Sequence, residues 1–295
     1  MRTGLVGLGG MGRGIAATLL EKGHELDLWN RSRGSAEALR GERSTVAGSP
    51  AEACRSGAVI SMLSDDRAIE AVALGPDGLR AGLPRGGVHV SMSTISPEAA
   101  ERLAAAHAGA GQLFVSAPVF GRPDAAAAGQ LFVVAAGPPA AIEKVRPLLE
   151  AAGQALYVLS GKPADANVVK LAGNFMITAA IEALAESLAL VGKAGISPET
   201  FLRILTETLF AAPAYRTYGK VLIEGRFSPP GFRLPLGAKD NRLLLREGER
   251  HDVPLPLASL IHDRMIAALA KGYGELDWSS FGRIAAEEAG LAPSP

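Results

Sequence analysis

The segment Met1–Arg33 constrains the fold more than any other part of the sequence. Apolar Thr3–Val6 predicts a short strand, Arg13–Lys22 has helical character, and Glu25–Trp29 alternates like a second strand. Between the first strand and the helix stands the glycine pattern G-x-G-x-x-G. The pattern alone is a weak signal, but here it has the preceding strand and following helix that dinucleotide binding requires. The segment therefore predicts a βαβ unit that binds a dinucleotide.

Each glycine of the pattern has a separate steric reason. Gly7 permits the tight turn, Gly9 lets the backbone approach a pyrophosphate, and Gly12 lets the helix pack closely on the strand. The free N–H groups at the helix start then face the pyrophosphate. The alternative is a glycine-rich turn that binds nothing, and the flanking strand and helix disfavour it.

The end of the second strand indicates which dinucleotide is bound. An NAD site usually has Asp or Glu there, bonded to the ribose 2′-hydroxyl. This sequence has Asn30, Arg31 and Ser32 instead. No carboxylate repels a 2′-phosphate, and the Arg31 guanidinium can pair with one. The sequence therefore favours NADP(H) over NAD(H), although Arg31 as a plain surface charge would leave the preference open.

Strands and helices of about ten residues keep alternating up to residue 159, which predicts an α/β fold with a doubly wound, largely parallel Rossmann sheet. Ligands of such sheets lie beyond the carboxyl ends of the strands. Four loops are therefore expected to share one crevice: Leu8–Met11, Asn30–Ser32, Met62–Asp65 and Met92–Thr94. The later predicted strands are Ala58–Leu63, Gly87–Met92, Gln112–Ser116, Gln130–Ala136 and Ala155–Leu159.

The pattern changes near residue 163. Ala166–Lys193 is helical throughout, about 40 Å long at 1.5 Å per residue, and helical segments continue past Phe227. We predict two domains, an NADP-binding Rossmann domain of residues 1–163 and an all-helical substrate and oligomerisation domain of residues 164–295. The long helix joins the two.

Lys170 and Asn174 are four residues apart on the long helix and so lie on one face. Both are polar in an otherwise apolar first half of that helix. A partly buried ammonium is costly and loses its proton more readily than an exposed one, which suits proton transfer. The alternative is that Lys170 extends to solvent and Asn174 is a surface amide.

Composition excludes several classes of partner. The 30 Lys and Arg balance the 30 Asp and Glu, so neither nucleic acid nor a membrane surface is expected as a general partner. No stretch reaches about 18 uninterrupted apolar residues, and the opening strand predicts no signal peptide. One cysteine, Cys54, fits a reducing cytoplasm, and the five histidines are too far apart in sequence to predict a metal site.

Several motifs in order along the chain resemble the β-hydroxyacid dehydrogenase family, which includes 3-hydroxyisobutyrate dehydrogenases and 6-phosphogluconate dehydrogenase-like proteins. Within this family, the motifs most resemble those of NADPH-dependent glyoxylate/succinic semialdehyde reductases. The matching motifs are Gly7-Leu8-Gly9-Gly10-Met11-Gly12, Ala117-Pro118-Val119 with Gly121, Lys170 with Asn174, Lys239-Asp240 and Asp277-Trp278-Ser279. Any one of these motifs is weak evidence, and the ordered set is strong.

The resemblance implies hydride transfer between NADP(H) and a small aldehyde or alcohol that carries a carboxylate. It implies that Lys170 is the general acid and base and that Asn174 positions the substrate, with Ser93 nearby. The loop Val119–Gly121 would offer backbone N–H groups to the carboxylate. The implied cofactor contacts, besides the glycine loop and residues 30–32, are Met62, Leu63, Thr94 and Lys239.

The substrate loop departs from the family pattern. The family commonly has Ser-Gly-Gly where this chain has Phe120-Gly121-Arg122. The serine hydroxyl that helps hold a carboxylate is absent, so the contact rests on backbone N–H groups and on Arg122. A larger or less acidic substrate is compatible with this change.

Two other functions remain open. Imine reductases share the fold, but they typically have Asp or Tyr in place of Lys170, so the lysine favours carbonyl chemistry. A non-catalytic NADP sensor is the second alternative, because a fold alone confers no activity. The family is generally oligomeric, so we expect a cytoplasmic homodimer or homotetramer acting on a small molecule, without a metal.

Overall fold

The structure is a computed structural model that describes residues 1–291. The chain forms two compact units, Met1–Lys170 and Leu171–Pro295. The predicted boundary at residues 163 and 164 falls at the start of helix α9 (Pro163–Lys193), whereas the units divide further along that helix. The functions assigned to the two predicted domains stay predictions.

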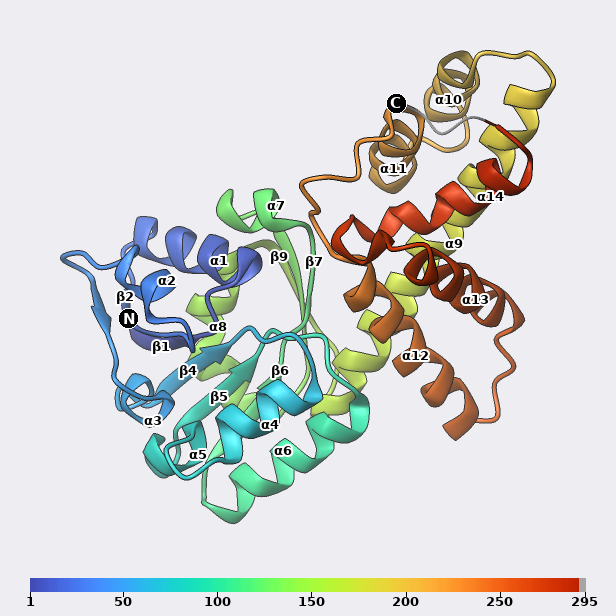
Figure 1. Cartoon of the computed structure of the whole chain (residues 1–295). Coiled ribbons are helices and arrows are strands. Elements are labelled where there is room, and N and C mark those ends of the chain that lie inside the picture. The colour runs from blue at the N-terminus through green and yellow to red at the C-terminus, as the bar shows by residue number, and fades with distance from the viewer. Residues whose placement is uncertain (292–295) are drawn as a thin grey trace. The chain divides into compact units, whose positions relative to one another are not determined.

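A six-stranded parallel sheet is the centre of the first unit (Figure 1). Its strands are β1 (Arg2–Val6), β2 (Glu25–Trp29), β3 (Ser44–Val46), β4 (Ala58–Ser61), β5 (Val88–Ser91) and β6 (Leu113–Ser116). Their order is β3-β2-β1-β4-β5-β6, and every neighbouring pair is parallel. This confirms the predicted doubly wound sheet. Strand β3 was not predicted, because a three-residue strand with one buried side chain is too short to show a clear alternation of apolar and polar residues.

Helices cover both faces of this sheet. The helices of this unit are α1 (Gly10–Glu21), α2 (Arg33–Glu37), α3 (Pro50–Ala53), α4 (Asp66–Leu74), α5 (Leu79–Gly82), α6 (Pro97–Gly109), α8 (Pro139–Ala152) and the short α7 (Pro123–Ala127), which packs on α1. Apolar side chains of α1 and α8 fill one core layer, and those of α4 and α6 fill the other. Helices α3, α4 and α6 are capped by Ser49, Asp65 and Ser96, since each of these side chains accepts a backbone N–H in the first turn of its helix.

A second, smaller sheet was not predicted. The strands β7 (Val119–Phe120), β8 (Leu131–Ala135) and β9 (Gly153–Val158) pair in that order. Segments 130–136 and 155–159 were expected in the main parallel sheet, and this is wrong. Strand β7 runs antiparallel to β8, and one isolated bridge, Ser116 to Ala136, links this sheet to β6. A two-residue strand inside a loop is too short to be recognised from its sequence.

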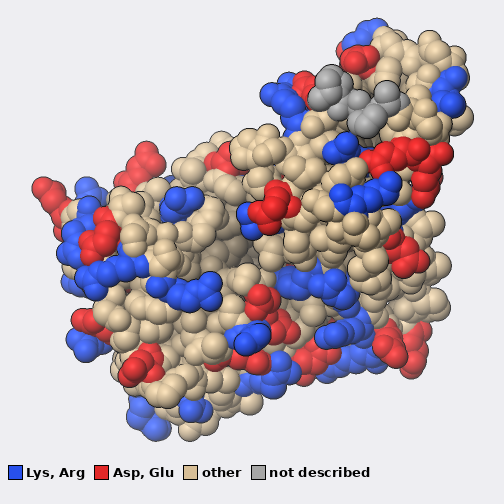
Figure 2. Space-filling model, viewed as in Figure 1, with Lys and Arg blue, Asp and Glu red and all other residues tan. Residues whose placement is uncertain are grey.

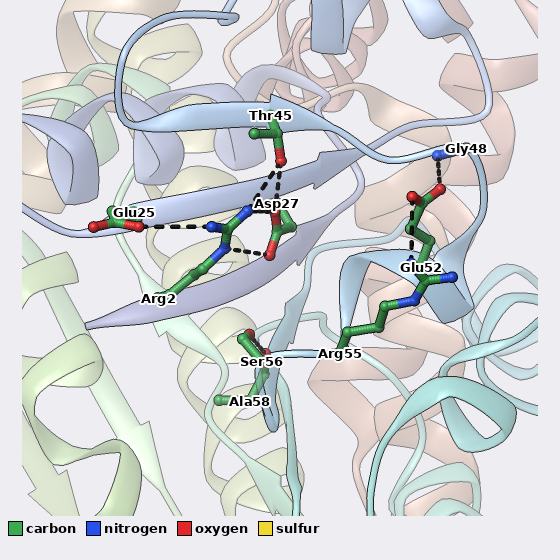
Figure 3. Close-up of polar contacts among 9 residues, drawn as sticks. All are labelled: Arg2, Glu25, Asp27, Thr45, Gly48, Glu52, Arg55, Ser56 and Ala58. Carbon is green, nitrogen blue, oxygen red and sulfur yellow. Dashed lines mark hydrogen bonds and ion pairs between the residues drawn. The ribbon is translucent and has the colours of Figure 1, made fainter.

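An ion pair joins the strands β1, β2 and β3 (Figure 3). The Arg2 guanidinium donates two hydrogen bonds to the Asp27 carboxylate, of 2.9 and 2.6 Å, and the Thr45 hydroxyl donates a third, of 2.5 Å. Burial alone raises the pKa of the Asp27 carboxyl, but these hydrogen bonds outweigh it and the pKa lies below its ordinary value. The three strands are thereby tied side by side through polar groups.

The second unit is built from helices. Besides the larger part of α9, it contains α10 (Pro198–Glu207), α11 (Pro213–Glu224), α12 (Leu234–Arg250), α13 (Pro256–Ala270), η1 (Tyr273–Glu275), η2 (Trp278–Gly282) and α14 (Arg283–Glu288). Ile181 and Leu184 of α9 pack with Ile261, Met265 and Phe281 in its core. This confirms the helical second domain and the predicted long helix, which begins at Pro163 rather than at Ala166 and ends at Lys193 as predicted.

The Asp277-Trp278-Ser279 motif has structural contacts within this unit. The Asp277 carboxylate accepts the Ser279 N–H and the N–H groups of Gly231 and Phe232. The Trp278 indole N–H donates to the Tyr218 hydroxyl at 3.0 Å. The motif therefore fixes a turn and a buried ring.

Helix α9 is long and apolar enough, by length and composition alone, to cross a membrane. The core helix of a soluble protein passes the same test, and α9 carries buried polar side chains such as Asn174 and Glu182. Figure 2 shows basic and acidic side chains interspersed over the visible face, in keeping with their equal numbers in the sequence. The expected absence of membrane and nucleic-acid partners stays a prediction.

Candidate active site

Backbone contacts shape the glycine loop between β1 and α1. Gly7 has φ +92°, a backbone conformation that residues other than glycine rarely adopt. A Cβ on Gly12 would lie 1.9 Å from the Gly7 carbonyl oxygen, so only glycine fits there. Helix α1 begins at Gly10 rather than at Arg13 as predicted, with Gly9 as its N-cap. The helix start therefore lies inside the glycine pattern itself.

Open space at the loop suits a phosphate group. A Cβ on Gly9 would meet nothing within 4 Å, and both Gly9 and Gly10 are exposed. The first turn of α1 contains no acidic residue. Its N–H groups and the positive end of the helix dipole are therefore available to an anion. The residues present fit a dinucleotide pyrophosphate.

Asn30 braces this loop. Its side-chain oxygen accepts the Leu8 N–H at 2.9 Å, and its amide nitrogen donates to the Ser32 carbonyl at 3.0 Å. Arg31 and Ser32 are exposed, and Arg31 makes no hydrogen bond or ion pair with any residue that the structure describes. The neighbouring Arg33 is paired with Glu37 at 3.0 Å. Arg31 is thus the cation at the end of β2 that is available to a ligand.

The loops after β4 and β5 are tied to each other and to the glycine loop. The Leu63 N–H donates to the Ser93 hydroxyl at 2.8 Å. A Cβ on Gly7 would lie 2.2 Å from the Met62 carbonyl oxygen, so the two backbones are in close contact. Met62, Leu63 and Thr94 are partly exposed, whereas Ser93 is fully buried. The four predicted loops follow the same edge of the sheet, and the Ser93 hydroxyl braces two of them.

The predicted substrate loop lies next to the glycine loop. Val119 is buried in β7, Phe120 is half-buried, and Gly121 has φ +140°. Arg122 is the N-cap of α7, and the next residue, Pro123, lies 3.5 Å from where a Gly10 Cβ would be. Helix α7 packs on α1, since the Thr18 hydroxyl donates to the Ala126 carbonyl at 2.8 Å.

Lys170 lies on α9 beside this substrate loop. Its side chain is buried, with 8% of the residue exposed, and its Nζ is 4.2 Å from the centre of the Phe120 ring. This distance allows a cation–π attraction. The start of α9 is fixed by Asn167, whose amide donates to the Ser116 hydroxyl at 2.6 Å. The idea that Lys170 extends to solvent is wrong for this structure.

A second polar cluster lies within the helical unit. The Asn174 amide donates to the Asp240 carboxylate at 2.7 Å, and the Lys239 ammonium lies 3.0 Å from the same carboxylate. Asn174 and Asp240 are buried, and Lys239 is mostly so. Asn174 is thus a buried amide and not a surface one. It follows Lys170 by four residues on α9, so the two side chains leave the same face of that helix.

Sequence reasoning missed three residues of these clusters as site residues. Asn167 anchors α9, Asp240 links Asn174 to Lys239, and Asn241 is buried with neither end of its amide hydrogen-bonded. Asn241 borders a cavity of about 10 Å³, which is at the lower limit of the volume that can hold one water molecule. The signal available in the sequence was that these polar residues lie next to recognised motifs. Asp240 was noted only as part of the Lys239-Asp240 motif and not as a site residue.

The Cys54 thiol and the His89–His107 pair lie outside the residues proposed for the site. Burial raises the pKa of the Cys54 thiol to about 11, which keeps it protonated and unreactive. His89 and His107 were described as far apart, but their rings are hydrogen-bonded at 2.9 Å. Sequence distance was misleading here, because β5 and α6 bring these two histidines together.

Comparisons with known proteins identify the family. Residues 2–161 match the NAD binding domain of 6-phosphogluconate dehydrogenase, and residues 164–284 match the NAD-binding family of NADP-dependent 3-hydroxyisobutyrate dehydrogenase. The chain is 41% identical over 281 residues to the uncharacterized oxidoreductase YfjR of Bacillus subtilis (strain 168), covering 95% of this chain and 98% of that protein. It is 31% identical over 281 residues to glyoxylate/succinic semialdehyde reductase 1 of Arabidopsis thaliana, covering 95% of this chain and 96% of that protein.

A solved structure agrees with these sequence matches. The 3-hydroxyisobutyrate dehydrogenase of Salmonella typhimurium superposes with a TM-score of 0.84 and 27% identity, covering 96% of this chain and 99% of that one. The glycine loop, the sheet order and the long helix α9 are therefore those of an established enzyme family. The chain belongs to the 3-hydroxyisobutyrate dehydrogenase family of NAD(P)-dependent oxidoreductases, which act on CH–OH groups.

Proposed function

We propose that the protein transfers hydride between NADP(H) and a small carboxylate-bearing aldehyde or the corresponding 3- or 4-hydroxyacid, with Lys170 as general acid and base. The observation that carries the proposal is the buried Lys170 ammonium, held 4.2 Å from Phe120 of the substrate loop. A relative named glyoxylate/succinic semialdehyde reductase supports the substrate class.

The cofactor would be held by the glycine loop, with Met62, Leu63, Thr94 and Lys239 as further contacts. When bound, its nicotinamide supplies or accepts the hydride. The Lys170 ammonium donates a proton to the carbonyl oxygen during reduction, and the amine takes it back from the alcohol in the reverse direction. Asn174 and Ser93 help to position the substrate, and backbone N–H groups of residues 119–121 with Arg122 bind its carboxylate.

The preference for NADP(H) rests on the end of β2. Arg31 is exposed and has no partner among residues 1–291, and Asn30 and Ser32 bring no carboxylate that would repel a 2′-phosphate. A guanidinium matches the geometry of phosphate oxygens. The cofactor with a 2′-phosphate should therefore bind more tightly than the one without it.

We also propose that the protein is a homodimer or homotetramer. Helix α10 has no fully buried residue, and several large apolar side chains of the helical unit are exposed: Leu190, Ile196, Ile204 and Leu209. Apolar surface of this extent is typical of an association surface. Sedimentation should give a mass that is two or four times 30.4 kDa.

A substrate panel tests the proposed reaction. NADPH consumption is measured with succinic semialdehyde, glyoxylate and a cyclic imine. We expect turnover with at least one aldehyde. Reduction of the imine alone would replace this proposal with imine reduction. Tight NADPH binding without turnover of any compound would favour a non-catalytic sensor.

A further inference from the structure

A hydrogen-bonded row of four side chains crosses the core of the first unit. The Ser61 hydroxyl lies 2.8 Å from His89 Nε2, His89 Nδ1 lies 2.9 Å from His107 Nε2, and His107 Nδ1 lies 2.7 Å from Gln112 Oε1. Three of the four residues are fully buried, and Gln112 is 5% exposed. We call these four residues the histidine network. It has no part in the proton transfer described above.

The Gln112 amide sets the direction of the hydrogen bonds. Its nitrogen donates to the carbonyl oxygens of Arg80 and Leu83, at 2.9 and 2.5 Å. Both neighbours are acceptors, so the nitrogen must face them and the amide oxygen must face His107. A carboxamide oxygen only accepts, and His107 Nδ1 therefore carries a proton.

The remaining hydrogen bonds follow for neutral rings. With Nδ1 protonated, His107 Nε2 accepts from His89 Nδ1–H, and His89 Nε2 accepts from the Ser61 hydroxyl. Burial lowers the pKa of His89 well below its ordinary value, and the neighbouring His107 lowers it further. Burial also lowers the pKa of His107, against the opposing effect of Gln112. Both rings are thus neutral near pH 7, and every nitrogen has one defined partner.

Aromatic packing holds the two rings in place. Phe114 on β6 lies edge-on to His89, with ring centres 5.1 Å apart, and stacked with His107 at 5.9 Å. The strands β4, β5 and β6 and helix α6 each contribute a member of this assembly. It is therefore a rigid connection between α6 and the end of β4.

The end of β4 is where the cofactor loops meet. The Ser61 carbonyl accepts the Met92 N–H at 2.9 Å, and Ser61 is followed directly by Met62. The Met62 carbonyl oxygen lies against Gly7, at 2.2 Å from where a Cβ would be. A shift of Ser61 by a few tenths of an ångström would therefore be transmitted to the glycine loop, because no space separates these groups.

We propose that the histidine network positions the cofactor cradle. It holds Ser61 and Met62, and through Met62 the Gly7 turn, at the spacing that the bound dinucleotide requires. His89 and His107 are positioning residues that never touch the cofactor. This inference rests on the proposed function, which assigns Met62 and Gly7 to the cofactor site.

A double-mutant cycle tests the inference, with the dissociation constant of NADPH as its measured quantity. His107→Leu breaks the network on α6, away from the glycine loop, and Ser61→Ala breaks it at the loop. We expect each change to raise the constant about tenfold and the double change to raise it no further. The value of kcat at saturating NADPH should stay within about twofold, which a general loss of structure would not allow.

Leu103→Ala is the matched control. Leu103 is fully buried on α6, one turn before His107, and it lies outside the network. Its truncation should lower Tm while leaving the dissociation constant of NADPH unchanged. If His107→Leu fails to fold, His107→Gln takes its place in the cycle, with a smaller rise expected because a polar side chain of similar length remains.

Three results would overturn the inference. They are an unchanged dissociation constant in the His107 variant, additive effects of the two changes, and an equal rise in Leu103→Ala. Gly12→Ala separates these results from a failure of the proposed function. If Gly12→Ala weakens NADPH binding and His107→Leu does not, the cofactor site stands and the positioning role is wrong. If Gly12→Ala also has no effect, the proposed cofactor site is wrong.

Discussion

The glycine loop and the substrate loop lie side by side but are shaped in different ways. In the glycine loop, backbone atoms contact backbone atoms, as where a Cβ on Gly12 would lie 1.9 Å from the Gly7 carbonyl. In the substrate loop, the Phe120 ring lies against the Lys170 side chain, whose Nζ is 4.2 Å from the ring centre. Contacts between backbones admit glycine alone, whereas contacts between side chains admit several residues. The cofactor is therefore easier to infer than the substrate.

The largest expected effect lies on the substrate side of this comparison. Lys170→Ala removes the proposed proton donor and should lower kcat by about 100- to 10,000-fold. The dissociation constant of NADPH, measured by fluorescence titration, should stay within about threefold. Lys162→Ala, which changes an exposed lysine just before α9, is the control and should retain full activity. Unchanged turnover in Lys170→Ala would refute the proposed mechanism.

Two substitutions in the glycine loop separate its effect on stability from its effect on NADPH binding. Gly12→Ala places a Cβ on the Gly7 carbonyl, and overpacking of this kind costs about 1–3 kcal/mol. It should lower Tm and weaken NADPH binding by about 100-fold. Gly9→Ala adds its Cβ in open space, so Tm should stay unchanged while NADPH binding weakens. If Gly9→Ala binds NADPH normally, the pyrophosphate does not approach Gly9.

The sequence predicted the elements that depend on local patterns. The glycine turn, β1, β2 and the end of α9 at Lys193 follow from the spacing of apolar residues and from helix-breaking residues, and the structure confirms them. The sheet of β7, β8 and β9 was missed because pairing between strands is set by tertiary packing. The His89–His107 contact was missed for the same reason, since neither residue has a local signal of its partner.

The role of Arg31, at the exposed end of β2, can be tested by measuring the cofactor preference. Arg31→Ala removes the proposed partner of the 2′-phosphate, and charged hydrogen bonds contribute about 1.5–3 kcal/mol. We expect the ratio of kcat/KM for NADPH over NADH to fall about tenfold, since solvent weakens an exposed pair. Arg33→Ala is the matched control, because Arg33 is equally exposed but paired with Glu37. An equal loss in both variants would mean that the preference reflects general positive charge.

The smallest expected effect concerns Phe120, where the two loops differ most. A cation–π contact contributes about 0.5–2 kcal/mol and favours the ammonium form of the lysine. Phe120→Leu keeps an apolar side chain but removes the ring, so kcat/KM should fall a few-fold and the alkaline limb of its pH profile should move to lower pH. Phe120→Ser restores the hydroxyl common in the family, and it should favour carboxylate-bearing aldehydes over neutral ones.

Phe132→Leu separates these effects from a loss of strand packing. Phe132 is opposite Phe120 in the β7–β8 pair and is 41% exposed, so it shares the same strand contact. Its replacement should leave the pH profile unchanged. If Phe132→Leu and Phe120→Leu shift the profile equally, the ring acts through the sheet and not on Lys170. If neither shifts it, Phe120 fills space in the substrate loop, and the chemistry of Lys170 is set by its burial on α9.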